Sequence, residues 1–332
     1  MANVERDLAH KIIEHTHTNL FLTGRAGTGK TTFLRQLREQ SHKRMVVLAP
    51  TGIAAINAGG VTIHSFLQLP FGMYIPGSQF AKEQFRFSNR KRKLIRSLDL
   101  IVIDEISMVR ADLLDCMDAA LRRIRIDARP FGGVQLLMIG DLQQLPPVVR
   151  DEDRETLRKY YESEFFFSSQ ALKRTPFITI ELQKVYRQTD QDFLELLNAV
   201  RDNRADDNTL QRLNTRYRPD FKASGSTYVR LVTHNHQADH INAHEMKQLT
   251  TSEHQFRAVV EGTFPESSYP AAEVLTLKRG AQVMFIKNDS SAEHRYFNGL
   301  LGEITEISEK YVVVRPQDSS EEISVGVETW QN

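Results

Sequence analysis

The chain lacks several features that define other protein classes. Its 332 residues contain one cysteine, Cys116, which excludes an intramolecular disulfide and fits a reducing compartment. No apolar run approaches the roughly 20 residues that a helix needs to cross a membrane. The N-terminus is polar and acidic, unlike a secretory signal. We therefore expect a protein of the cytoplasm or nucleoid with no membrane partner.

Neither sign of charge prevails in the sequence. Because 43 Lys and Arg residues face 42 Asp and Glu residues, the formal charge is +1, and any contact with nucleic acid must be local. The composition, 40% hydrophobic and 26% charged, is typical of a soluble globular protein. The length indicates two domains, with a small third as an alternative.

The first half alternates short apolar runs with helical patterns, which predicts a parallel α/β sheet. Expected strands cover residues 19–23, 44–49, 98–104 and 135–140. Cys116 lies in a helical pattern at 111–122, so we interpret it as a packing residue and not as a nucleophile. In such sheets, ligands bind just beyond the carboxyl ends of the strands.

The pattern changes in the rest of the chain. Residues 70–96 are loop-like and then basic, which indicates an insertion in the first domain. A second α/β segment is expected from residue 177, with a helix at 192–201 and a strand at 228–233. From about residue 280, closely spaced β runs with turn residues predict a small barrel or meander.

The strongest motif is GRAGTGKT at residues 24–31, between a predicted strand and a predicted helix. Its backbone amides can surround phosphates, and the helix N-terminus adds the positive end of a dipole. We expect Lys30 to bind the β- and γ-phosphates of a nucleotide and Thr31 to ligate Mg²⁺. The expected nucleotide-binding residues are Gly24, Ala26, Gly27, Thr28, Gly29, Lys30, Thr31 and Thr32.

Polar side chains follow two of the other predicted strands. We expect Asp104 to hold Mg²⁺ and Glu105 to polarise the attacking water, with a helix N-cap as the alternative for this pair. Gln144, in GDLQQLPP at 140–147, is a candidate catalytic residue that senses the γ-phosphate. A surface turn is an equal alternative for this segment.

Taken together, the motifs resemble those of superfamily-one DNA helicases. GRAGTGKT, APTGIAAINAGGVTIHSF (49–66), IDEISM (103–108), GDLQQLPPV (140–148) and VYRQ (185–188) occur in the order and spacing of that family. They are most similar to the Pif (petite integration frequency) branch, and more distantly to RecD and Dda-type enzymes. The resemblance covers essentially the whole chain. It implies an ATP-dependent helicase, with ATP and Mg²⁺ as cofactors, that moves 5′-to-3′ on single-stranded DNA.

The resemblance also implies the architecture and the partners. It implies two RecA-like lobes with parallel sheets, the first at 1–172 with a wedge-like insertion at about 67–96, the second partly at 173–284. A small β-barrel insertion is expected at 285–332. The implied partners are single-stranded DNA and fork or partial-duplex DNA, bound by a monomer, in roles such as DNA repair and telomere maintenance.

Further site residues follow from the resemblance alone. Arg187 matches the family's arginine finger, which stabilises charge at the γ-phosphate only when the lobes close. For Phe66, packing in the core is an equal alternative to stacking on DNA bases. The residues that match DNA-contacting positions are Pro50, Thr51, Gly52, His64, Phe66, Thr233 and Asn235.

The sequence departs from the family in two places. Residues 4–18 lack the glutamine that reads adenine in relatives, and the chain stops before two C-terminal motifs of the family. We therefore expect the second lobe to be incomplete and unwinding to be limited. The chain would then be either a fragment of a longer helicase or a shortened natural variant. The alternatives are a nucleotide-dependent single-stranded DNA-binding protein with little turnover and a P-loop switch that acts on protein partners.

Overall fold

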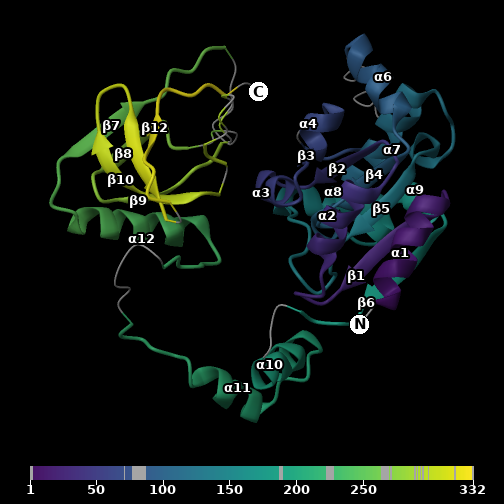
Figure 1. Cartoon of the computed structure of the whole chain (residues 1–332), viewed down its shortest axis with the longest axis horizontal. Coiled ribbons are helices and arrows are strands. Elements are labelled where there is room, and N and C mark those ends of the chain that lie inside the picture. The colour runs from purple at the N-terminus through teal and green to yellow at the C-terminus, as the bar shows by residue number, and fades with distance from the viewer. Residues whose placement is uncertain are drawn as a thin grey trace. The chain divides into compact units, whose positions relative to one another are not determined.

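The chain divides into two compact units, Met1–Tyr217 and Arg218–Asn332 (Figure 1). The computed structural model describes residues 3–70, 72–76, 87–186, 190–221, 228–262, 269, 271–287, 289, 291, 293, 295–297, 299–317 and 319–330. Within these ranges, every helix is too short or too polar to span a membrane.

A six-stranded sheet lies at the centre of unit 1 (Figure 1). Its order is β3-β2-β4-β5-β1-β6, and every neighbouring pair is parallel. The predicted α/β class and the four predicted strands are confirmed. The strands are β1 (Asn19–Gly24), β2 (Met45–Ala49), β3 (Val61–Thr62), β4 (Leu100–Ile103), β5 (Gln135–Ile139) and β6 (Phe177–Leu182).

Helices bury both faces of this sheet, which explains why its inner strands are largely apolar. Leu100 and Val102 of β4 share a core with Phe33 of α2, whereas Ile101 and Ile103 belong to the core on the opposite face, formed with α7. Full burial of each such side chain contributes roughly 1.5–3 kcal/mol. The helical elements are α1 (Val4–His15), α2 (Lys30–Gln40), α3 (Gly52–Asn57), α4 (Ile63–Leu67), α6 (Asn89–Ser97), η1 (Ile106–Met108), α7 (Ala111–Arg125), η2 (Pro130–Gly133), α8 (Asp151–Tyr160), η3 (Phe166–Ser168) and α9 (Gln170–Lys173).

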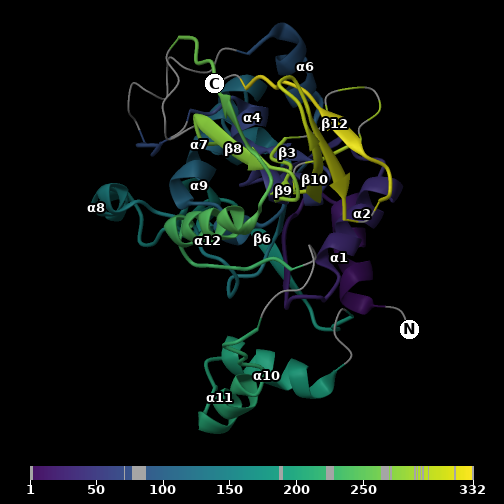
Figure 2. The same cartoon turned by 90° about the vertical axis from the view of Figure 1, so that its left-hand side faces the viewer.

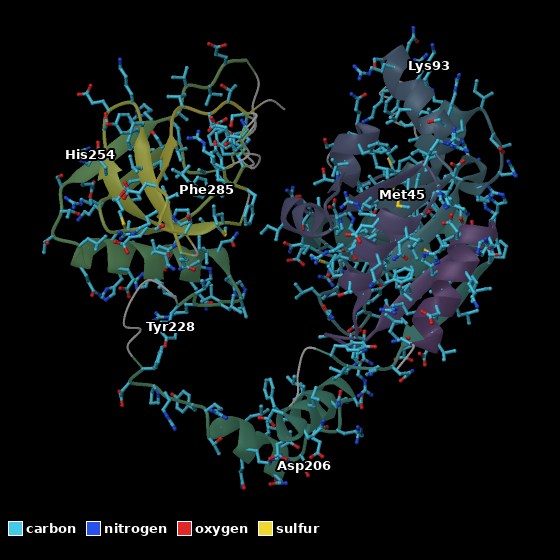
Figure 3. The ribbon with its side chains drawn as sticks, in the orientation of Figure 1. Met45, Lys93, Asp206, Tyr228, His254 and Phe285 are labelled. Atoms are coloured by element: carbon cyan, nitrogen blue, oxygen red, sulfur yellow. The ribbon has the colours of Figure 1, made fainter. Side chains whose placement is uncertain are left out.

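The basic run within the predicted insertion forms α6. The Ser88 side chain caps this helix by accepting from the Lys91 backbone N–H, and Ile95 packs into the core. The side chain of Lys93 projects from the helix (Figure 3). Residues 71 and 77–86 of the predicted wedge lie outside the described residues.

Strand β6 corrects the predicted boundary at residue 173. The sequence places residues 177–180 in a second lobe, but β6 pairs with β1 along six residues, from Asn19 opposite Phe177 to Gly24 opposite Leu182. The first sheet therefore extends to Leu182. A run of this kind has no local signal for its pairing partner, because parallel strands are joined through space and not by a turn.

Two further helices end unit 1, α10 (Gln191–Arg201) and α11 (Asp207–Asn214), which lie side by side (Figure 2). The predicted helix at 192–201 is confirmed by α10. The Asp190 side chain caps it by accepting from the Phe193 backbone N–H at 3.1 Å.

Unit 2 contains α12 (Asn235–Gln248), the hairpin of β7 (Glu253–Arg257) and β8 (Val274–Lys278), and a four-stranded antiparallel meander. The meander confirms the β runs expected from residue 280, although it begins before residue 285. Phe285, labelled in Figure 3, stacks on Tyr296 in its core. Its strands are β9 (Gln282–Met284), β10 (Leu301–Ile307), β11 (Val312–Pro316) and β12 (Ile323–Val325).

The predicted strand at 228–233 is wrong. These residues form no strand in the structure, and Leu231 is 91% exposed. Tyr228 lies in the extended segment before α12 (Figure 3). A short run of aromatic and β-branched residues forms a strand only when a neighbouring strand completes its hydrogen bonds. No described residue pairs with this segment in a ladder.

Candidate nucleotide-binding site

The GRAGTGKT loop connects β1 to α2 by a turn that requires glycine. Gly24 has a φ of +147°, and a Cβ atom there would lie 2.7 Å from the Leu182 carbonyl oxygen. Gly29 adopts the left-handed conformation, with a φ of +93°, where α2 begins. Because L side chains are strained in these conformations, the motif has glycine where the backbone turns most sharply.

Lys30 folds back over the loop. Its Nζ donates to the carbonyl oxygens of Gly24, at 2.6 Å, and Arg25, at 3.1 Å. Burial lowers the pKa of Lys30, although nearby Asp141 and Glu105 oppose that shift. Thr28 is buried, and Thr31 and Thr32 are exposed on the first turn of α2. The predicted nucleotide-binding residues therefore lie together in the loop and the start of the helix.

Asp104 and Glu105 follow β4. The Asp104 backbone N–H donates to the Leu48 carbonyl at 2.8 Å, which holds Asp104 at the end of the sheet. Burial, together with the neighbouring Glu105 carboxylate, raises the pKa of Asp104 to about 6. Glu105 has a φ of +51° and precedes η1, but its side chain makes no capping hydrogen bond. The N-cap alternative is therefore not supported for Glu105.

Gln144 belongs to a hydrogen-bonded cluster around Asp141, after β5. Gln144 Nε2 donates to Asp141 Oδ2 at 3.0 Å, and the Gln143 backbone N–H donates to Oδ1 at 3.1 Å. Arg201 of α10 donates to Oδ2 at 2.6 Å. Sequence reasoning missed Asp141 and Arg201; an acidic residue directly after a buried strand was the available signal for Asp141.

A third missed residue, Tyr186, contacts the same loop. Its backbone N–H donates to the Gly27 carbonyl at 2.8 Å, and its hydroxyl accepts from Asn3 Nδ2 at 3.2 Å. A Cβ atom on Gly29 would lie 3.8 Å from the Tyr186 ring. The predicted arginine finger, Arg187, lies outside the described residues.

The sheet explains why these groups meet. Strands β1, β4 and β5 run parallel, so their carboxyl ends lie on one edge. The charges of Asp141, Glu105 and Asp104 all act on Lys30. A lysine, a glycine-rich loop and paired carboxylates suit the binding of a phosphate chain and phosphoryl transfer, which depends on positioning and charge neutralisation.

The predicted DNA-contacting residues of unit 1 follow β2 and β3 on the same edge. Pro50, Thr51 and Gly52 lead into α3, and Thr51 Oγ1 accepts from the Ala54 backbone N–H at 3.2 Å. His64 is half-buried on α4, and burial together with Arg110 lowers its pKa.

Phe66 is a core residue. It is 5% exposed, and Lys91 Nζ lies 4.2 Å from the centre of its ring. The structure thus favours packing over base stacking for this residue. In unit 2, the predicted DNA-contacting residues Thr233 and Asn235 are exposed at the start of α12, not after a strand.

The sequence profile of the PIF1-like helicase family matches residues 2–211. The ATP-dependent DNA helicase PIF1 of Saccharomyces cerevisiae is 35% identical over 319 residues, which cover 91% of this chain and 35% of that protein. Human ATP-dependent DNA helicase PIF1 is 36% identical, over 86% of this chain and 43% of that protein. The chain thus spans less than half the length of these two relatives.

Solved structures agree with the sequence matches. Bacteroides Pif1 bound to single-stranded DNA is 40% identical, with a TM-score of 0.86, and the match covers 100% of this chain and 76% of that one. The same identity, TM-score and coverage hold for Bacteroides Pif1 in complex with ADP-AlF3 and single-stranded DNA. Profile, sequence and structure agree, and the chain belongs to the PIF1-like helicase family.

Proposed function

We propose that the chain couples ATP hydrolysis to 5′-to-3′ movement on single-stranded DNA, as the motor part of a DNA helicase. The observation that carries this proposal is that the phosphate loop, the Asp104–Glu105 pair and the Gln144 cluster follow three parallel strands on one edge of the sheet. Support comes from the similar Bacteroides structures that contain single-stranded DNA and ADP-AlF3. By this likeness we place the protein in the bacterial cytoplasm, acting as a monomer on single-stranded, forked or partial-duplex DNA.

The phosphates would lie against the backbone of residues 24–32, where Lys30 exchanges its two carbonyl partners for phosphate oxygens. Thr31 and Asp104 would hold Mg²⁺. The raised pKa of Asp104 fits this assignment, because a divalent cation relieves the repulsion between this buried carboxylate and Glu105. Bound Mg²⁺ would neutralise charge on the phosphate oxygens.

Hydrolysis would use three further residues. Glu105 would orient and deprotonate the attacking water, and Gln144 would contact the γ-phosphate. Arg187 would stabilise the charge that develops during transfer. Its sequence neighbour Tyr186 contacts the loop at Gly27, which supports this proposed role.

The protein would bind the DNA backbone without sequence specificity. Thr51 and Gly52 would offer backbone N–H groups, and Thr51 its hydroxyl, to phosphates, as Thr233 and Asn235 would in unit 2. Pro50, which has no backbone N–H, would contact the DNA through its ring. The lowered pKa of His64 keeps its ring neutral near pH 7, so we assign it hydrogen bonding or stacking and not charge pairing. We assign Phe66 to packing in the core and not to DNA contact.

The deciding experiment measures ATPase rate with and without oligo-dT. Wild-type protein should be stimulated at least tenfold, and Lys30→Ala should abolish turnover. Lys159→Ala is a matched control, because this exposed lysine pairs only loosely with Glu155, at 3.7 Å. Nucleotide and DNA binding without stimulation would instead identify a nucleotide-dependent DNA-binding protein with little turnover.

The arginine finger has its own test. Arg187→Ala should remove the stimulation by DNA while nucleotide affinity stays within about threefold, because the finger acts on the transition state. Loss of nucleotide binding itself would contradict the assignment of Arg187.

A further inference from the structure

The C-terminal end of α10 contacts both the phosphate loop and the loop after β5. Arg201 Nη1 donates to Asp141 Oδ2 at 2.6 Å, after β5. The next residue, Asp202, lies 3.8 Å from the guanidinium of Arg25 in the phosphate loop. One helix end therefore contacts the loop that bears Gln144 and the loop that bears Lys30.

The pair between Arg201 and Asp141 differs from the surface ion pairs of unit 1. The Asp141 side chain is 2% exposed and that of Arg201 is 20% exposed, so little water competes for this contact. Exposed pairs contribute little to structure, whereas a buried carboxylate depends strongly on its partner. Asp141 without Arg201 would be a buried negative charge next to Lys30.

The same oxygen of Asp141 links Arg201 to the proposed sensor. Oδ2 accepts from both Arg201 Nη1 and Gln144 Nε2, and Oδ1 fixes the turn through the Gln143 backbone N–H. Gln144 is itself exposed, and among the described residues Asp141 is the partner that orients its amide. Any shift of Arg201 changes the carboxylate that orients Gln144.

We propose that Arg201 is a positioning residue that holds Gln144, through Asp141, where Gln144 distinguishes a nucleoside triphosphate from a diphosphate. This inference rests on the proposed function, in which Gln144 contacts the γ-phosphate. Through this network, movement of α10 would change the contact between Gln144 and the nucleotide, independently of Arg187.

The test compares the affinities of the full chain for ATPγS and ADP, each measured with Mg²⁺ by displacement of a fluorescent ADP. Wild-type protein should prefer ATPγS. Arg201→Gln and Gln144→Ala should each reduce that preference at least fivefold. The double variant should lose no more than a further twofold, because both residues act through one network.

Arg204→Gln is the matched control, since Arg204 lies three residues after Arg201, is 68% exposed and pairs with Asp202. It should keep the wild-type preference within twofold. The variant Asp141→Asn with Arg201→Gln removes both charges, so it leaves no unpaired buried carboxylate to unfold the chain. It should lose the preference as Arg201→Gln does.

Three results would overturn the proposal: equal affinity of the wild type for both nucleotides, an unchanged preference in Arg201→Gln, or losses that multiply in the double variant. The assay contains no DNA. Failure here is therefore distinct from failure of oligo-dT to stimulate the wild-type ATPase, which would count against the proposed function itself.

Discussion

Substitution of Asp115 by asparagine tests how α7 is held against residues 161–171. Asp115, on α7, is 6% exposed and accepts four hydrogen bonds. Oδ2 accepts from Tyr161 Oη at 2.9 Å and the Gln170 backbone N–H at 3.1 Å. Oδ1 accepts from Ser169 Oγ at 2.5 Å and the Ala171 backbone N–H at 2.9 Å.

Each carboxylate oxygen thus accepts from one hydroxyl and one backbone N–H. This arrangement determines how much stability the substitution costs. A hydroxyl can turn and accept from an asparagine NH₂, but a backbone N–H cannot. Whichever oxygen is replaced, one backbone N–H loses its acceptor, either the buried N–H of Ala171 or the partly buried N–H of Gln170, at up to about 1–3 kcal/mol. The other bonds lose the assistance of the charge, roughly 1 kcal/mol each.

Asparagine also avoids burying a charge, which offsets these losses by a few kcal/mol. We expect a net destabilisation of about 2 kcal/mol for Asp115→Asn. Urea unfolding followed by circular dichroism at 222 nm should show it. Trp330, the chain's one tryptophan, lies in unit 2, so its fluorescence transition should stay unchanged.

The sign of the measured change in unfolding free energy shows which of the two effects is larger. If Asp115→Asn left unit 1 as stable as the wild type, or more stable, desolvation of the charge would outweigh the four hydrogen bonds. Glu155→Gln, at a side chain that is 87% exposed, should change stability by less than about 0.5 kcal/mol and controls for charge loss alone.

Three other predictions concern charge, backbone and metal. Arg44 holds the pKa of Asp99 at about 2, below the model-peptide value of 3.8, so the ion pair stabilises the fold above pH 4 and is lost as pH falls through about 2. Asp99→Asn should cost about 1 kcal/mol at pH 7, after screening, in urea melts, and progressively less as pH falls from 4 through about 2. Gly24→Ala, whose Cβ would meet the Leu182 carbonyl, should weaken binding of fluorescent ADP at least tenfold; unchanged affinity would contradict the loop geometry. Thr31→Ala should raise the Mg²⁺ concentration for half-maximal ATPase several-fold, and an unchanged value would remove Thr31 from the metal site.

The features that sequence predicted well are those with local causes. The phosphate loop was identifiable because its glycines, Lys30 and Thr31 are consecutive between a strand and a helix. Strand β4 was identifiable because burial on both faces makes it apolar at every position. The chain's alternation of strands and helices also indicated the parallel sheet that carries the site.

The features that sequence missed depend on pairing across space. Leu182 and its strand look the same whether they begin a new sheet or extend the first one, and only the contact with β1 separates the two cases. Residues 228–233 have the composition of a strand but no described partner. Arg201 is 60 positions from Asp141, so nothing in the local pattern marks it as part of the site.

The charges at the sheet edge show why a triphosphate would require a metal here. Among the described residues, the carboxylates of Asp141, Asp104 and Glu105 lie near the cations Lys30 and Arg201, and Arg201 is paired with Asp141. A triphosphate adds several negative charges to this edge. They would lie next to Asp104, whose pKa is already raised by burial and by the Glu105 carboxylate. Lys30 alone cannot balance them. A divalent cation between Asp104 and the phosphates would offset both repulsions at once, so nucleotide affinity should depend steeply on Mg²⁺ in the triphosphate state and weakly in the diphosphate state.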